Sequence, residues 1–253
     1  QMCIRDRRCN SAGSMTNRDP LFLSQPNFRR DMNLALFDMD GTLLPIDSNH
    51  AFGLHMVKLG WTDGSEWLAR NNAFINDHHQ GVLNLDHFID FATEVWRERP
   101  RREVLAARDA FIQQVVIPAI PPASRSLIAK HKDAGDLTAI VTGSNEFIAE
   151  PIAKEFGVDH LLAVRLERNA SGVVTGRIDG IPSFHAGKID RVHEWLSTLG
   201  RRLAEFDRVT FYGDSVNDIP LMDVVNDPVA VNPSDHLRHL AVMRGWPILT
   251  TFE

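Results

Sequence analysis

The run Leu34-Ala35-Leu36-Phe37-Asp38-Met39-Asp40-Gly41-Thr42 decides how the rest of the chain is interpreted. Four apolar residues, typical of a buried strand, lead directly into two carboxylates, a glycine and a threonine. A second run of this kind, Val209-Thr210-Phe211-Tyr212 followed by Gly213-Asp214-Ser215-Val216-Asn217-Asp218, lies near the other end of the chain. In α/β sheets the active site lies where such strands give way to loops. Both clusters are therefore predicted to belong to one site.

The four carboxylates of these clusters would repel one another if the fold brought them together without a cation. Mg²⁺ is a hard cation that is held by one or two carboxylates together with water and substrate phosphate oxygens. We therefore expect Mg²⁺ as the cofactor and a small phosphorylated metabolite as the substrate.

Composition is that of an ordinary globular enzyme. The 253 residues are 43% apolar and carry a formal net charge of −6, and no basic stripe with interleaved aromatic residues occurs, which argues against a nucleic-acid partner. No apolar run approaches the roughly 18 to 20 residues that span a bilayer, so we expect no membrane partner. The two cysteines, Cys3 and Cys9, lie outside any segment with a folding pattern, and a reducing, cytoplasmic setting is the expectation.

The chain divides into three parts. Residues 1–31 mix Arg, Asn, Ser and Asp without a period that would bury one face, so we expect a disordered or non-native tail, with the natural start at Met15 or Met32. Residues 47–117 show helical spacing of apolar residues and end at the helix-breaking Pro118. Residues 32–46 and 118–253 alternate strands and helices, which predicts a parallel sheet covered on both faces.

The sequence predicts the structure of three segments within residues 118–253. A strand from Leu137 to Val141 delivers Thr142, Gly143 and Ser144 to the same edge of the sheet as the two acidic clusters. A helix from about Glu146 to Phe156 is expected to be bent or interrupted at Pro151. The segments 161–167 and 173–178 flank Asn169-Ala170-Ser171-Gly172 and are expected to pair as a β-hairpin.

Taken in order, these motifs resemble those of a known family. Asp38-x-Asp40-Gly41-Thr42, Thr142 at the end of a second strand, Lys188, and Gly213-Asp214-x-x-x-Asp218 are similar to the four motifs of the haloacid dehalogenase superfamily of phosphohydrolases. The helical stretch between the first two motifs and the Val174-Thr175-Gly176-Arg177 segment resemble its subfamily IB, the phosphoserine-phosphatase-like branch. The resemblance implies an α/β, Rossmann-like core with an inserted helical cap, and Mg²⁺-dependent hydrolysis of phosphomonoesters.

Phosphoryl transfer requires a nucleophile in line with the leaving group and positive charge around the remaining oxygens. Asp38 is the expected nucleophile, because a carboxylate can form an aspartyl-phosphate and divide hydrolysis into two easier steps. Asp40 is expected to protonate the leaving oxygen and later to deprotonate the attacking water. Lys188, by the resemblance, balances the charge of the phosphoryl group and of Asp38.

The resemblance also implies a metal and substrate shell. Mg²⁺ would be bound by the side chains of Asp38 and Asp214 and by the backbone carbonyl of Asp40, with Asp218 close by to orient a metal-bound water or the lysine. Thr142 and Gly143 would contact the phosphoryl oxygens. Asn217 would help to hold the substrate.

Substrate choice is expected to depend on the cap. Asp47 stands where phosphoserine phosphatases have a Glu that binds the substrate ammonium, and an Asp could do so with a shorter reach. The cap arginine that binds the serine carboxylate aligns with Ala92, so that carboxylate clamp is missing unless Arg97 or a neighbour replaces it. An amine-bearing phosphate without a carboxylate, such as histidinol phosphate, is at least as well matched as phosphoserine.

The same residues are compatible with other functions. A phosphotransferase that uses an acceptor other than water stays open, and a non-catalytic phosphometabolite-binding protein is disfavoured because Asp38, Asp40 and Lys188 are all present. The first motif is not interpreted as a calcium loop, because it lacks the Gly and Glu that such a loop carries. Three other sets of residues are expected to be structural or solvated: surface histidines at 78–79, 236 and 239, tryptophans 61, 67 and 96 in the cap core, and a solvated junction of arginines 97, 99, 101 and 102.

Overall fold

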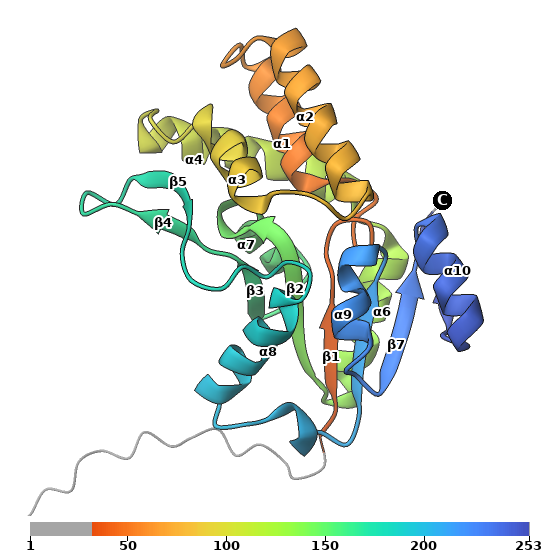
Figure 1. Ribbon diagram of the computed structural model, residues 1–253. Coiled ribbons are helices and arrows are strands. Elements are labelled where there is room, and N and C mark those ends of the chain that lie inside the picture. The colour runs from red at the N-terminus through yellow and green to blue at the C-terminus, as the bar shows by residue number, and fades with distance from the viewer. Residues whose placement is uncertain (1–31, 253) are drawn as a thin grey trace, which may run out of the picture. The chain divides into compact units, whose positions relative to one another are not determined.

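A six-stranded sheet in the order β3-β2-β1-β6-β7-β8 forms the centre of the protein, and every neighbouring pair is parallel (Figure 1). The structure is a computed structural model that describes residues 32–252, so the tail expected at 1–31 and both cysteines lie outside the described residues. The strands of the sheet are β1 (Leu34–Phe37), β2 (Leu137–Asn145), β3 (His160–Val164), β6 (Val209–Gly213), β7 (Asp227–Val231) and β8 (Ile248–Leu249).

Strand β1 lies in the middle of the sheet and is buried on both faces. Leu34 and Leu36 belong to one apolar cluster, and Ala35 and Phe37 belong to the other, as expected when successive side chains of a strand point to opposite faces. All four side chains are fully buried. The continuous apolar run of β1 is therefore the signature of a central parallel strand.

Helices cover both faces of this sheet. On the Phe37 side lie α6 (Pro122–Ala134) and α7 (Glu146–Glu155), and on the Leu36 side lie α8 (Gly187–Thr198), α9 (Ile219–Met222) and α10 (Asp235–Arg244). Short 3-10 turns occur at Leu203–Glu205 and Val216–Asp218. The predicted α/β, Rossmann-like class is confirmed.

The long connection from β1 to α6 is helical. Its elements are α1 (Ser48–Lys58), α2 (Gly64–His79), α3 (Leu85–Glu94), α4 (Arg101–Phe111), a π-helical turn at Ile112–Val116 and α5 (Ile117–Ala119). We call residues 48–119 the helical insert. Figure 1 shows it at the edge of the sheet where β1 and β2 end. Its helical content agrees with the sequence, and its behaviour as a separate cap stays a prediction.

Tryptophans pack within the insert and against the core. Trp67 and Trp96 are buried, and Trp67 stacks on Phe91 of α3. Trp96 stacks on Phe147 of α7, with 4.5 Å between the ring centroids. Trp96 is therefore part of the contact between insert and core as well as of the insert itself.

The predicted hairpin was partly wrong. The segment 161–164 is all of β3 except its first residue, and β3 pairs with β2 in the main sheet. Only β4 (Leu166–Arg168) pairs antiparallel with β5 (Val174–Ile178). Leu162, Ala163 and Val164 of β3 are buried in the core, which a two-stranded hairpin could not achieve. Burial therefore decides where this strand pairs.

Helix α7 runs through Pro151 without a break, contrary to the expected bend or interruption. A proline has no N–H, so the carbonyl of Phe147, four residues earlier, loses its partner within the helix. The guanidinium of Arg108, on α4, donates to that carbonyl at 3.4 Å. A donor from the helical insert thus replaces the missing one.

No single helix among residues 32–252 is both long and apolar enough to cross a membrane. One pair of helical segments, Arg101–Ala119 and Pro122–Ala134, passes the same criteria jointly, but the two meet at 90°. The cytoplasmic setting stays a prediction.

Candidate active site

Three buried charged side chains meet beyond the end of β1. Asp38 follows the strand, and its backbone N–H donates to the carbonyl of Tyr212 at 2.8 Å, which anchors it beside β6. The ammonium of Lys188, on the first turn of α8, donates to Asp38 Oδ1 at 2.7 Å and to Asp218 Oδ1 at 2.6 Å. Lys188 is 2% exposed and Asp218 is fully buried. The lysine thus joins the two acidic clusters.

Asp214 completes the group from the loop after β6. Oxygen atoms of Asp38, Asp214 and Asp218 all lie within 4.8 Å of one another. The hydroxyl of Thr42 donates to Asp214 Oδ1 at 3.1 Å. Gly41, with φ +80°, lies so close that a Cβ atom there would be 2.3 Å from Asp214 Oδ2. The glycine of the first motif is therefore required by this close approach.

The charges of this group do not balance. Burial raises the pKa of Asp38 to about 6, although the nearby Lys188 opposes this rise. Burial, with Asp38 and Asp218 as neighbours, raises the pKa of Asp214 well above its usual range. Burial disfavours the charged form of Lys188, yet the two carboxylates that it contacts outweigh this and raise its pKa. One ammonium facing three carboxylates leaves an excess of negative charge, and a donor set made only of oxygen fits a hard divalent cation.

Both oxygens of Asp218 are already engaged. Oδ1 accepts from Lys188, and Oδ2 accepts from the backbone N–H groups of Asp214 at 3.1 Å and of Ser215 at 3.2 Å. Asp218 therefore holds both the lysine and the loop that carries Asp214. This geometry favours a role in orienting its neighbours over direct ligation of a metal.

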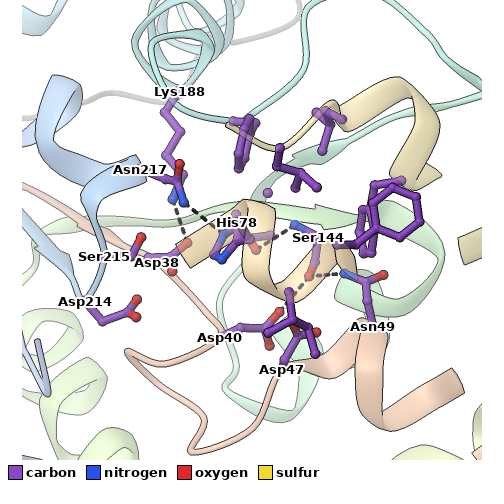
Figure 2. Close-up of a pocket in the computed structure, with 18 of the residues that line it drawn as sticks. Asp38, Asp40, Asp47, Asn49, His78, Ser144, Lys188, Asp214, Ser215 and Asn217 are labelled. Carbon is purple, nitrogen blue, oxygen red and sulfur yellow. Dashed lines mark hydrogen bonds and ion pairs between the residues drawn. The ribbon is translucent and has the colours of Figure 1, made fainter. Parts of the chain in front are cut away.

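Asp40 points away from the Lys188 group toward two serines. Ser144 Oγ donates to Asp40 Oδ2 at 2.6 Å (Figure 2). Ser48 Oγ donates to the same oxygen at 2.8 Å. Asp40 Oδ1 is buried and has no hydrogen-bond partner among the described residues. Burial, followed by the nearby negative charge of Asp47, raises the pKa of Asp40 to about 8. This environment therefore favours the protonated form of the Asp40 carboxyl group.

One pocket brings the predicted site residues together. Figure 2 shows it between the edge of the sheet and the helical insert. Asp218 is fully buried and does not line the pocket. Every other residue predicted for the site does: Asp38, Asp40, Asp47, Thr142, Gly143, Lys188, Asp214 and Asn217. Thr142 is buried, and its hydroxyl oxygen accepts the N–H of Ser144 at 3.1 Å. Its hydroxyl hydrogen can still be donated to a ligand.

Sequence reasoning missed a polar network at this pocket. Asn49 Nδ2 donates to Ser144 Oγ at 2.7 Å, and Asn71 Nδ2 lies 2.6 Å from His50 Nδ1. Ser144 directly follows Thr142 and Gly143 of the second motif, so its place in the sequence could have indicated that it lies at the pocket. Asn49 and Asn71 lie on helices with no motif to mark them.

The prediction for the histidines was wrong at one position. His78, at the end of α2, lines the pocket, and its Nε2 lies 2.9 Å from Nδ2 of Asn217 (Figure 2). This contact joins the insert to the loop after β6, which no local pattern could have indicated. His236 and His239 are exposed, as predicted.

The arginine run is only partly a solvated junction. Arg97 pairs with Asp90 on α3, and the guanidinium of Arg99 lies over the ring of Trp61. No arginine is found among the described residues that line the active-site pocket. Arg97 therefore does not replace the missing carboxylate clamp.

A model of the family described as haloacid dehalogenase-like hydrolase matches residues 35–223. The chain belongs to the haloacid dehalogenase-like hydrolases. The matched range includes both acidic clusters, the helical insert, Thr142 and Lys188. A histidinol-phosphatase of Neisseria meningitidis serogroup C is 38% identical over 217 residues, which cover 86% of this chain and 98% of that protein. A phosphoserine phosphatase of Mycobacterium tuberculosis is 32% identical over 226 residues, covering 85% of this chain and 69% of that protein. This haloacid dehalogenase-like hydrolase is a phosphatase.

Solved structures agree with the fold. A protein of unknown function from Bordetella pertussis Tohama I has a TM-score of 0.83 at 38% identity, covering 88% of this chain and all of that one. A substrate-bound phosphoserine phosphatase has a TM-score of 0.62 at 18% identity, covering 87% of this chain and 93% of that one. At this lower identity the likeness shows that the two share a fold.

Proposed function

We propose that this phosphatase hydrolyses a small phosphomonoester that carries an ammonium group and no carboxylate. The observation that supports this proposal is the composition of the pocket wall. Away from Lys188, the described lining residues include the carboxylate of Asp47 and several amides but no arginine. A substrate carboxylate would have no guanidinium to bind there, whereas an ammonium would have a carboxylate.

Asp47 is placed to act as that carboxylate. Its Oδ1 accepts the backbone N–H of His50 at 2.9 Å and so caps α1, which leaves Oδ2 available. No lysine or arginine of the described residues forms an ion pair with Asp47. An exposed carboxylate at the pocket that is held by its own helix, and that has no cation of its own, is suited to bind a ligand ammonium.

Another part of the wall is apolar and comes from the insert. It consists of Phe74, Ile75, Leu83, Leu85 and Phe88. An amine-bearing phosphate with a flat or apolar portion would cover this wall. Histidinol phosphate has that composition, and the Neisseria relative is a histidinol-phosphatase. We therefore propose histidinol phosphate or a closely similar amino-alkyl phosphate as the substrate.

In the proposed mechanism, Asp38 attacks the phosphorus atom and forms an aspartyl-phosphate as the bond to the leaving oxygen breaks. The proton on Asp40, carried by the otherwise unpartnered Oδ1, passes to that leaving oxygen. Asp40 is then a carboxylate and takes a proton from the water that attacks the aspartyl-phosphate. The two serines at Oδ2 hold the carboxyl group in position throughout.

Positive charge around the phosphoryl oxygens comes from Lys188 and, we propose, from Mg²⁺. Asp38 and Asp214 would hold the ion, which would neutralise developing charge on the phosphoryl group. Thr142 would donate its hydroxyl to a phosphoryl oxygen, and Lys188 would keep Asp38 ionised despite its burial.

A phosphotransferase remains a second candidate for the same site, because the second step differs only in the acceptor. Product analysis in the presence of amino alcohols or sugar alcohols separates the two. Inorganic phosphate as the only phosphorylated product supports hydrolysis, and a phosphorylated alcohol supports transfer.

The substrate proposal is tested with Asp47→Asn and a panel of phosphate esters assayed with Mg²⁺. We expect KM for histidinol phosphate to rise about tenfold, since a charge-assisted contact is lost, while KM for p-nitrophenyl phosphate changes little. Asp109→Asn, which alters an exposed carboxylate on α4, is the matched control. Equal effects of Asp47→Asn on both substrates would contradict the assignment.

A further inference from the structure

A second cavity, of about 470 Å³, lies where the helical insert, α7 and the β4–β5 hairpin meet. We call it the junction cavity. Figure 1 labels the elements that contribute its lining residues: α4, α7 and strands β4 and β5 of the hairpin. Its volume is within the range of small-molecule sites. It shares no lining residue with the active-site pocket, so it is a separate feature of the molecule.

Five arginines line the junction cavity, and two of them are uncompensated. The other three, and both lining glutamates, have ion-pair partners: Arg97 with Asp90, Arg108 with Asp109, Arg168 with Glu146, and Glu150 with Lys154. Within the described part of the chain, no carboxylate lies within 4 Å of the guanidinium of Arg99 or Arg101. The cavity therefore presents a net positive charge.

Arg99 is held in a defined orientation. Its guanidinium lies 4.4 Å from the centroid of the Trp61 ring, and its Nε donates to the carbonyl of Val95 at 3.2 Å. These neutral contacts position the group without neutralising it. A planar guanidinium fixed in this way is suited to bind a carboxylate or a phosphate.

Arg101 adds the positive end of a helix to this charge. It is the first residue of α4, whose N-cap is Pro100, and no side chain caps that end. The first N–H groups of a helix have no partner within it and favour anions. The two uncompensated arginines and this helix terminus thus lie at one cavity.

Apolar side chains also line the cavity. Trp96 and Val104 are buried, and the Phe147 ring is covered by the stacked Trp96 ring and by the guanidinium of Arg108, whose Cζ lies 4.9 Å from the ring centroid. Val173, which is 42% exposed, and the half-buried Leu105 provide the accessible apolar surface. A ligand with only charged groups would leave this surface exposed to water. An anion with an aromatic or aliphatic portion would cover it.

We propose that the junction cavity binds a small organic anion with two or more negative groups. Its charges lie at Arg99, Arg101 and the first turn of α4, and its apolar portion lies over Leu105 and Val173. Because the walls come from both the helical insert and the core, the bound anion stabilises their association.

Isothermal titration calorimetry with benzene-1,3,5-tricarboxylate, an aromatic trianion, tests this proposal on the full chain without divalent metal. Without metal the active site carries excess negative charge, which disfavours the probe there. We expect binding of one probe per chain, weakened about tenfold or more in Arg99→Gln/Arg101→Gln, since each arginine supplies a charge-assisted hydrogen bond. Arg202→Gln, at an arginine that is 82% exposed and far in sequence from the cavity, is the matched control and should bind as the parent does.

Two further measurements keep the result interpretable. The probe should raise the thermal unfolding midpoint of the parent protein but not that of the double variant. Arg101→Gln alone, at an exposed position, should fold normally and show part of the loss. No binding at millimolar probe, unchanged affinity in the double variant, or displacement of the probe by phenylphosphonate with Mg²⁺ would each overturn the proposal.

Discussion

Replacing Asp40 by Asn should separate the two chemical steps of the reaction. An asparagine oxygen can still accept the hydroxyl groups of Ser48 and Ser144, which lie 2.8 and 2.6 Å from Asp40 Oδ2, so the side chain should stay in place. Only the transferable proton is lost. General acid–base catalysis contributes about 10²- to 10⁴-fold, or roughly 3 to 5 kcal/mol of the barrier.

The size of the loss should depend on the leaving group. An amino-alkyl phosphate leaves as an alkoxide and needs a proton, so we expect its kcat to fall by about 10³-fold, the middle of that range. p-Nitrophenolate is stabilised without a proton, so phosphorylation of Asp38 should remain fast while the attack of water becomes slow.

Rapid-mixing absorbance measurements test this difference. With p-nitrophenyl phosphate the variant should release about one equivalent of p-nitrophenolate per active site in a burst, followed by a slow steady rate. Ser144→Ala, which keeps the carboxyl group and removes one of its donors, is the control and should show a smaller loss. A variant with no burst, and with the same loss on both substrates, would refute the assigned role of Asp40.

Four further predictions concern the metal and three buried charged or titratable residues. Asp38→Asn should abolish turnover while the protein stays folded by circular dichroism, and more than a few per cent residual activity in the variant would exclude Asp38 as the nucleophile. Excess EDTA should stop the parent enzyme reversibly, with activity restored by Mg²⁺. Lys188→Met should lower the free energy of unfolding of the metal-free protein by about 3 to 5 kcal/mol in urea titrations, because it leaves two buried carboxylates unpaired, and a loss below about 1 kcal/mol would show that the pair is not needed. Burial lowers the pKa of His55 below 6.5. The contribution of neutral His55 to stability should therefore be complete above about pH 6.5 and be lost as the pH falls through the folded-state pKa. His55→Gln should flatten the dependence of the free energy of unfolding on pH in this range, and an unchanged dependence would assign it to other groups.

The sequence predicted the central strands and the core of the site well. The predicted bounds of β1 agree with those observed, and β6 extends the predicted strand by the single residue Gly213. Central parallel strands are buried on both faces, so their apolar runs are continuous and easily recognised. The motif residues follow these strands directly, which is why Asp38 and Asp214 could be placed together.

Contacts between the insert and the core could not be predicted in this way. The pairing of His78 with Asn217 joins residues 139 positions apart, and Ser48 and Ser144 meet at Asp40 from two different elements. Such contacts depend on how the helices of the insert dock on the core, and this arrangement cannot be predicted from residue spacing or helix propensity. The strand at 161–164 was assigned to the wrong pair for a related reason. It pairs with β2 because its apolar side chains are buried in the core, and the local sequence does not specify that partner.

The carbonyl group that Pro151 leaves free has a consequence for how the protein melts. Since Arg108 supplies its donor, helix α7 is complete only while α4 remains docked. Detachment of the insert would remove that donor and would also unstack Trp96 from Phe147. We therefore expect the two regions to denature in a single cooperative transition, with no stable half-folded species in which the sheet persists alone.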